Sequence, residues 1–237
     1  MCQIAICNNR KITRNEIERF WNANSDGAGV VWKYGSRVLF KKGIMNKNDL
    51  IKFLEKINPP YIVHFRLASI GERKPELTHP FLCSEENPLS GELKKGQLLL
   101  FHNGHDSKAV EMLMIAKFVK GEEFNYKHIS DTRAIAILIS KLGPNILEHF
   151  SGKFVVVNWV FNIKTYGRFI ENDGILLSNG ISTEYFYNYD YFDEERCKFK
   201  ENPNLCPTKN YHACRFIWPA CPYNSWRKIN ENNNIKS

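Results

Sequence analysis

The chain has 237 residues, of which 43% are hydrophobic and 24% are charged, so it is long and apolar enough to bury a core without disulfides. Its longest strongly apolar runs, residues 134–139 and 154–161, are much shorter than the roughly 18 residues that a membrane-spanning helix needs. No basic region precedes a long apolar stretch at the N-terminus, so we expect no secretion signal, no membrane span and a cytoplasmic location. The net charge is +8, and residues 196–237 contribute +6 of it.

Periodicity and turn residues predict many strands and a few helices. A capping box, Thr13-Arg-Asn-Glu16, opens the first helix, and Pro59-Pro60 stops the second. In chain order the expected elements are a helix after Thr13, strands at 27–32 and 38–41 around a turn at Gly35-Ser36, a helix at 47–57, strands at 61–66 and 98–102, helices at 107–118 and 131–142, and strands at 153–161, 165–170 and 175–178. Residues 71–96 predict a long loop. This mixture is typical of an α+β layered domain.

Clear periodicity ends near residue 192, so we predict a main domain at 1–192 and a basic, Cys- and aromatic-rich extension at 193–237. The extension interleaves aromatic and basic residues, a pattern that could bind nucleic acid through phosphate contacts and base stacking. The same aromatic residues could instead pack a small subdomain onto the main domain. We favour the packed extension over a nucleic-acid partner.

The sequence has seven cysteines, three in the main domain and four in the extension. We expect free thiols rather than disulfides, because we expect no secretion signal. The cysteines of the extension are separated by eight, seven and six residues and form no Cys-x-x-Cys pair, so we expect no metal site there.

Cysteine at position 2 is the first candidate for chemistry. Methionine aminopeptidase removes Met1 when the next side chain is small, which would leave Cys2 with a free α-amine. An α-amine titrates at about 7.7 to 8.0 and can act as the general base for the thiol of its own residue. By itself, a cysteine at this position is more often incidental than catalytic.

Seven short motifs follow one another over residues 1–154. They are Met1-Cys2-Gln3-Ile4-Ala5, Ser25-Asp26-Gly27-Ala28-Gly29, His64-Phe65-Arg66-Leu67-Ala68-Ser69-Ile70-Gly71, Thr78-His79-Pro80-Phe81, Phe101-His102-Asn103-Gly104, Ser130-Asp131-Thr132 and Ser151-Gly152-Lys153-Phe154. In this order they resemble the class II glutamine amidotransferase domain, a member of the N-terminal-nucleophile (Ntn) hydrolases, and the His-Pro-Phe segment is typical of its small stand-alone members. The resemblance implies a four-layer αββα sandwich of two antiparallel sheets covered by helices.

The resemblance also implies a role for each matched residue. Cys2 would attack the side-chain amide of L-glutamine, form a γ-glutamyl thioester and release ammonia for an acceptor or a partner synthase subunit. Asn103 and the backbone N–H of Gly104 would form the oxyanion hole. The remaining matched residues are Arg66 for the substrate α-carboxylate, Asp131 for its α-ammonium, Ser69 as a further substrate contact, and Gly27 and Gly29 in the pocket wall. Neither a cofactor nor a metal is implied.

Each matched residue also has an ordinary structural interpretation. Arg66 at a strand end could be a surface ion-pair residue, Asn103-Gly104 could be a hairpin turn, and Asp131 could cap the helix that follows Ser130. The histidines of the motifs, His64, His79 and His102, are structural in this family.

Two other functions are compatible with the sequence. One is a catalytically silent amidotransferase-like protein that binds a partner or nucleic acid through the basic extension. The other is an N-terminal-nucleophile amidase for a different amide, in which Arg66 and Asp131 would be spectators.

Overall fold

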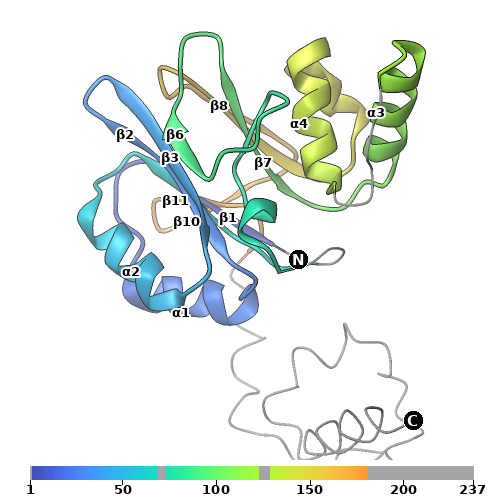
Figure 1. Cartoon of the computed structure of the whole chain (residues 1–237). Coiled ribbons are helices and arrows are strands. Elements are labelled where there is room, and N and C mark those ends of the chain that lie inside the picture. Colours follow the sequence, from blue (N-terminus) through green and yellow to red (C-terminus); the bar gives the residue numbers. More distant parts are fainter. Residues whose placement is uncertain (1, 69–72, 123–128, 181–237) are drawn as a thin grey trace, which may run out of the picture. The chain divides into compact units, whose positions relative to one another are not determined.

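Two antiparallel β-sheets lie face to face at the centre of the structure, a computed structural model that describes residues 2–68, 73–122 and 129–180 (Figure 1). The larger sheet has the strand order β10-β11-β1-β4-β2-β3-β6, and the smaller sheet has the order β5-β7-β8-β9. The strands are β1 (Gln3–Cys7), β2 (Ala28–Tyr34), β3 (Arg37–Ile44), β4 (Tyr61–Phe65), β5 (Phe81–Leu82), β6 (Ser90–Glu92), β7 (Leu98–Asn103), β8 (Lys153–Asn158), β9 (Ile163–Tyr166), β10 (Ile170–Asn172) and β11 (Ile175–Leu177).

Helices cover the outer face of each sheet. In Figure 1, α1 (Arg14–Ala23) and α2 (Lys47–Lys56) lie against the larger sheet, and α3 (Lys108–Val119) and α4 (Asp131–Leu142) lie against the smaller one. Two short 3₁₀ helices, η1 (Pro75–Leu77) and η2 (Pro144–His149), complete the described elements. The layer order is helices, sheet, sheet, helices, which confirms the α+β sandwich expected from the sequence.

The core between the sheets is built from strands that are buried on both faces. Every residue of β1 and β4 is buried, and Ile4, Ile6 and Ile62 face Phe101 and Val155 of the smaller sheet. The opposite face of these strands packs on the helices, where the ring of Phe20 in α1 lies 5.4 Å from that of Phe65 in β4. Burial of large apolar side chains on both faces is the main stabilising contribution to this arrangement.

The predicted capping box of α1 is confirmed. The Glu16 N–H donates to Thr13 Oγ1 (3.3 Å), and Glu16 Oε2 accepts from the Thr13 N–H (2.7 Å). The Arg10 guanidinium also binds the Glu16 carboxylate with two hydrogen bonds, of 2.9 and 2.7 Å. Partial burial raises the pKa of Glu16, but the bonds from Arg10 and Thr13 outweigh it and lower the pKa to about 2. The helix start is therefore fixed by a charge-assisted network.

Two strand predictions need correction, and one central strand was not predicted. Residues 165–170 do not form one strand: β9 ends at Tyr166, Gly167 has a φ of +82°, and Ile170 begins β10 in the other sheet. Residues 153–161 form a strand only to Asn158, whose side-chain oxygen accepts from the N–H groups of Val160 and Asn162 and so begins a turn. Strand β1, at the centre of the larger sheet, was not among the expected elements.

The long segment predicted as a loop contains short ordered elements that are tied to β3. In its described part, 73–96, the Thr78 hydroxyl accepts from the Gly43 N–H (2.6 Å), and the buried Lys42 ammonium donates to the Glu76 carbonyl (3.0 Å) and to the Asn87 side chain. Burial lowers the pKa of Lys42 to about 7, and the positive charge of Arg133 acts in the same direction. These bonds hold η1, Thr78 and Asn87 against β3 of the larger sheet.

The chain divides into two units, Met1–Gly180 and Ile181–Ser237, and all described residues belong to the first. The predicted boundary at residue 192 and the Cys- and aromatic-rich extension at 193–237 lie outside the described residues and stay predictions. Among the described helices, none is long and apolar enough to cross a membrane.

Candidate active site

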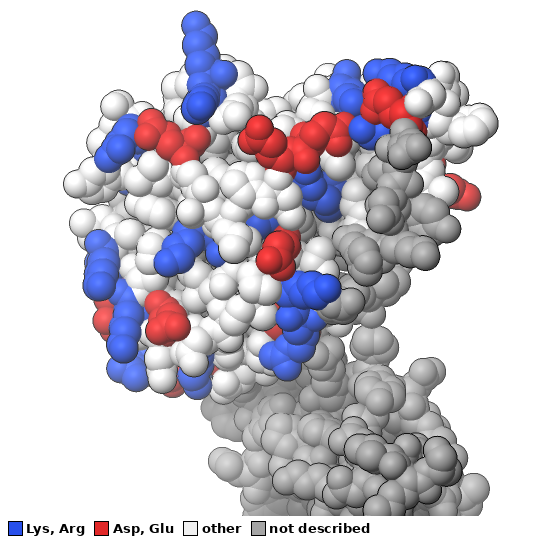
Figure 2. All heavy atoms as spheres, in the orientation of Figure 1, with Lys and Arg blue, Asp and Glu red and all other residues white. Residues whose placement is uncertain are grey.

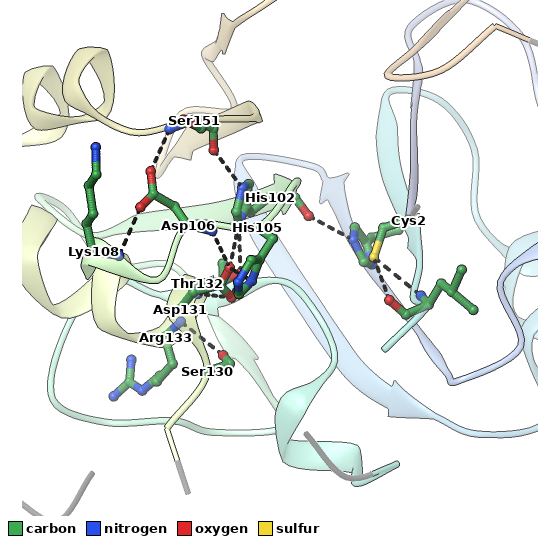
Figure 3. Close-up of polar contacts among 12 residues, drawn as sticks. Cys2, His102, His105, Asp106, Lys108, Ser130, Asp131, Thr132, Arg133 and Ser151 are labelled. Atoms are coloured by element: carbon green, nitrogen blue, oxygen red, sulfur yellow. Dashed lines mark hydrogen bonds and ion pairs between the residues drawn. The ribbon is translucent and has the colours of Figure 1, made fainter. Parts of the chain in front are cut away.

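The thiol of Cys2 lies directly before β1, beside the chain segment that follows β4. Its Sγ atom is 3.3 Å from the Leu67 nitrogen and 3.4 Å from the Leu67 carbonyl oxygen (Figure 3). Burial raises the pKa of this thiol, whereas the N–H of Leu67 and the positive charges of the N-terminus and Arg66 oppose the rise. The backbone N–H aimed at sulfur favours the thiolate, which is the nucleophilic form.

Arg66 follows β4 and is buried, with 5% of its surface exposed. Its backbone is tied to the segment before β2, because its N–H donates to the Gly27 carbonyl (2.8 Å) and its carbonyl accepts from the Asp26 N–H (3.0 Å). Burial lowers the pKa of the guanidinium, and the charges of Cys2, Asp26 and Asp131 act in the opposite direction. Arg66 is therefore a buried residue rather than a surface one, and it lies within electrostatic reach of two other residues predicted for the site.

Asp131 is the first residue of α4, and the cap itself is Ser130, whose hydroxyl accepts from the Arg133 N–H (3.2 Å). The Asp131 carboxylate accepts from the N–H groups of Thr132 (2.7 Å) and Asp106 (3.0 Å). Figure 3 shows His105 beside the same carboxylate, with Nδ1 at 3.3 Å from Oδ2. The carboxylate is thus held by backbone donors at a helix N-terminus, where negative charge is favoured.

Asn103 is the last residue of β7, and the chain continues through a short loop into α3, so the hairpin-turn interpretation of Asn103-Gly104 is wrong. The Asn103 side chain is buried; its Nδ2 donates to Ser178 Oγ (2.9 Å), and its Oδ1 has no hydrogen-bond partner among the described residues. The loop is anchored by the Asp106 carboxylate, which accepts from the N–H groups of Lys108 (3.0 Å) and Ser151 (2.8 Å).

Gly27 and Gly29 stand where the backbone of another segment approaches closely. A Cβ atom on Gly29 would lie 1.8 Å from the His79 carbonyl oxygen, and one on Gly27 would lie 2.7 Å from Thr78 Cγ2. Gly27 also has a φ of +109°, which side chains disfavour. These glycines let the segment at 78–79 pack against β2. Ser69, the remaining predicted contact, lies outside the described residues.

The three motif histidines are all buried: the rings of His64 and His79 are neighbours, whereas the His102 ring stacks on Phe154 and contacts Thr132 of α4. His64 Nε2 donates to the His102 carbonyl (3.1 Å), and the rings of His64 and His79 are 4.0 Å apart. Burial lowers the pKa of His64 to about 3 and that of His79 far below its usual value. His102 Nε2 donates to the Ser151 carbonyl (3.3 Å), and its Nδ1 lies 3.0 Å from the Thr132 hydroxyl oxygen. Within the described residues, no three His, Cys, Asp or Glu side chains form a group that could hold a metal.

Sequence reasoning missed the residues at the end of β11. Ser178 contacts Asn103, as described above, and Asn179 Nδ2 donates to the Cys2 carbonyl oxygen at 2.7 Å. Neither residue belongs to the seven motifs, and the partners are separated by 75 and 177 positions along the chain, so no local pattern marks them. His105 and Asp106, next to the Asn-Gly motif, were also not singled out.

Charged side chains of both signs are interspersed on the face of the molecule in Figure 2. Lys and Arg lie among Asp and Glu there, so this face of the described unit carries no continuous basic patch of the kind that tracks a phosphate backbone. The strongly basic segment, residues 196–237, lies outside the described residues.

Comparison with known proteins relates the fold to amidotransferases. No family model and no curated protein matches this sequence. Among solved structures, glutamine phosphoribosylpyrophosphate (PRPP) amidotransferase from B. subtilis, complexed with ADP and GMP, is 20% identical with a TM-score of 0.53, and the match covers 75% of this chain and 42% of that one. A structure described as the allosteric regulatory enzyme of purine biosynthesis is 20% identical with a TM-score of 0.49, over 75% and 41% of the two chains.

The chain therefore spans less than half the length of each of these structures. At this sequence identity, the match to the first shows the fold alone. It confirms the resemblance predicted from the seven motifs at the level of fold, which is that of a glutamine amidotransferase.

Proposed function

We propose that this protein is a glutaminase of the class II amidotransferase type, with Cys2 as an N-terminal nucleophile. The observation that carries the proposal is the convergence of Cys2, Arg66 and Asp131 from three separate segments to within electrostatic reach of one another. A thiol, a buried guanidinium and a carboxylate are complementary to the side-chain amide, the α-carboxylate and the α-ammonium of one glutamine molecule.

The reaction starts once Met1 has been removed and the α-amine of Cys2 is free. The amine takes the thiol proton, and sulfur attacks the amide carbon of glutamine. The tetrahedral intermediate collapses by breaking the carbon–nitrogen bond, and the nitrogen receives the proton and leaves as ammonia. Water then hydrolyses the γ-glutamyl thioester to glutamate and restores the thiol.

Substrate binding is assigned to Arg66, Asp131 and Ser69. The planar guanidinium of Arg66 offers two parallel donors to the α-carboxylate, and the carboxylate of Asp131 accepts from the α-ammonium. Because Arg66 is buried, these charge interactions act in an environment where water screens them weakly.

The oxyanion hole is assigned to Asn103 and Gly104. The Asn103 amide carries two hydrogens on Nδ2, and one is used on Ser178, so the other is available to a tetrahedral oxygen. The Gly104 N–H would be the second donor. Removing one such donor in other enzymes slows catalysis by about 10² to 10³-fold.

The released ammonia is assigned to an acceptor or to a partner synthase subunit. We place the protein in the cytoplasm, in agreement with the sequence-based expectation.

The proposal is tested by replacing the nucleophile. Cys2→Ala and Cys2→Ser should lower glutamine hydrolysis by about 10³-fold or more, because the covalent step is lost. Cys7→Ala is the matched control: Cys7 is buried in β1, its pKa is raised to about 12 by burial, and it has no part in the proposed chemistry. Glutamate and ammonia release are measured, together with the intact mass of the active protein.

Two outcomes would contradict the proposal. Equal activity in the Cys2 and Cys7 variants would remove Cys2 from its role. An active protein whose mass retains Met1 would exclude the α-amine as the general base.

A further inference from the structure

The turn that follows β11 is attached by several hydrogen bonds to the first residues of β1. The Ser178 N–H donates to the Ile4 carbonyl (2.9 Å), and Ser178 Oγ accepts from the Ile4 N–H (2.9 Å). One residue further, Asn179 Nδ2 donates to the carbonyl oxygen of Cys2 (2.7 Å). The Cys2 carbonyl is therefore held by a side chain from the other end of the described unit.

The ammonium of Lys153, at the start of β8, fixes how the Asn179 amide is turned. Its Nζ contacts the Ser178 carbonyl oxygen and lies 3.3 Å from Asn179 Oδ1. A lysine ammonium has donors and no acceptor, so it requires the amide oxygen on its own side. The NH₂ of Asn179 must then face the Cys2 carbonyl, which accepts it. In the opposite orientation the Asn179 NH₂ would face the Lys153 ammonium, and the Asn179 oxygen would face the Cys2 carbonyl oxygen. Neither pair could then form a hydrogen bond.

The same turn reaches the other predicted half of the site. Ser178 Oγ accepts from both the Ile4 N–H and Asn103 Nδ2, each at 2.9 Å. Asn179 thus contacts the backbone of the nucleophile Cys2, and the neighbouring Ser178 contacts the side chain of Asn103, which is assigned to the oxyanion hole. None of these contacts involves Arg66 or Asp131.

We propose that Lys153 and Asn179 form a positioning pair that sets the nucleophile against the oxyanion hole, with Ser178 as the link to Asn103. This inference rests on the proposed function. Neither residue touches the substrate; both act through the Cys2 backbone. A displacement of about 1 Å of a reacting group can lower a rate about a hundredfold, so a tether at this point controls the chemical step rather than substrate affinity.

Four variants test the pair in the full chain. Asn179→Asp keeps the size and the attraction to Lys153 but replaces the donor to Cys2 with an acceptor. Lys153→Met removes the cation, and Lys153→Arg restores it. Asn179→Ala removes both contacts. The controls are Asn48→Asp and Lys95→Met, at exposed positions away from the site.

We expect kcat for glutamine hydrolysis to fall about tenfold or more in Asn179→Asp, Asn179→Ala and Lys153→Met, with KM changed less than twofold. Lys153→Arg should recover most of the lost kcat, and the controls should match the parent protein. Full kcat in Asn179→Asp, or a raised KM at unchanged kcat, overturns the proposal. A thermal unfolding curve of each variant confirms that it is folded.

A second measurement does not depend on glutamine. The rate at which iodoacetamide alkylates Cys2 is measured by peptide mass mapping, with Cys7 and Cys83 as internal references. Release of the tether should change the Cys2 rate at least threefold in Asn179→Asp and Lys153→Met, because the thiol loses its fixed place beside Leu67. Unchanged alkylation in both variants overturns the positioning role. A parent protein without glutaminase activity would instead refute the proposed function, while this second measurement would still decide the tether.

Discussion

At the scale of single residues, burial decides what Arg66 can do. An exposed arginine would be screened by water and would contribute little to binding, whereas an arginine residue that is 5% exposed keeps most of its attraction for a carboxylate. Burial also makes geometry important, because a buried charge needs partners in fixed directions. Two parallel N–H donors meet this requirement for a carboxylate, and a single ammonium does not.

Arg66→Lys should therefore raise KM for glutamine by about tenfold to a hundredfold with a smaller change in kcat. The expected change reflects the loss of one charge-assisted hydrogen bond, about 1.5 to 3 kcal/mol. Steady-state kinetics measure the effect, and Arg14→Lys is the control, since Arg14 is an exposed residue paired with Glu18. An unchanged KM would remove Arg66 from the substrate site, and a thiol that no longer reacts with iodoacetamide would point to a wider structural defect.

At the scale of secondary-structure elements, the contact between β2 and the segment at 78–79 sets a strict limit on side-chain size. The backbone of Gly29 faces the His79 carbonyl oxygen so closely that a methyl group has no room. A strand can normally accept alanine in place of glycine at little cost, so this position is exceptional.

Gly29→Ala should destabilise the protein by more than about 3 kcal/mol or prevent folding, because either β2 or the 78–79 segment must move. Gly35→Ala is the matched control. Gly35 has a φ of +61° but nothing within 4 Å of its added Cβ, so only the backbone strain of about 1 kcal/mol is expected. Urea unfolding measures both variants. Equal stability of the two variants would show that the 78–79 segment can move away from Gly29 at little energetic cost.

Elements with local signals were predicted well from the sequence. The bounds of α4 were predicted residue for residue, and the capping box placed the start of α1 correctly, because caps and apolar periodicity act over a few residues. The strand predicted at 165–170 failed because the chain changes sheets at Gly167, which only the tertiary fold decides. Strand β1 was missed because it is buried on both faces and, unlike β4 after Pro59-Pro60, has no turn signal before it.

The residues of the candidate site likewise divide into those with a local sequence signal and those without one. The motif residues Cys2, Arg66, Asn103 and Asp131 could be proposed because each sits in a recognisable short pattern. Asn179 could not, since its contact with Cys2 is set by the pairing of β1 with β11 and leaves no trace in the neighbouring sequence.

At the scale of the whole molecule, the buried histidines make stability depend on pH. Burial depresses the pKa of His64 to about 3, and that of His79 is also far below the ordinary value of about 6.5. Between about pH 6.5 and pH 3 the unfolded chain binds a proton at His64 and the native state does not. Stability therefore falls as pH decreases through this window, by about 1.4 kcal/mol per pH unit for His64, and the lowered pKa of His79 acts in the same direction.

Urea unfolding at pH 6.5 and pH 4.5 should show a loss of about 2 kcal/mol or more in the parent protein. In His79→Phe the loss should be smaller, because one of the groups with a lowered pKa is gone. His149→Phe, at an exposed position, should keep the parent's dependence on pH. An equal loss of unfolding free energy between the two pH values in all three proteins would show that other groups control acid unfolding. Glu16 adds a loss of the same sign, but mainly between about pH 4.5 and pH 2.

The place of β1 between β4 and β11 also has a consequence for synthesis on the ribosome. Ala5 pairs with Leu177, so β1 cannot complete its pairing until β11, the last described strand, has been synthesised. At about 5 to 20 residues per second, that interval is roughly ten to thirty seconds, during which one edge of β1 has no neighbour. Proteolysis that removes residues 175–179 would recreate this incomplete state in a finished chain. The nucleophile is thus the first part of the site to be made and the last to be set in place.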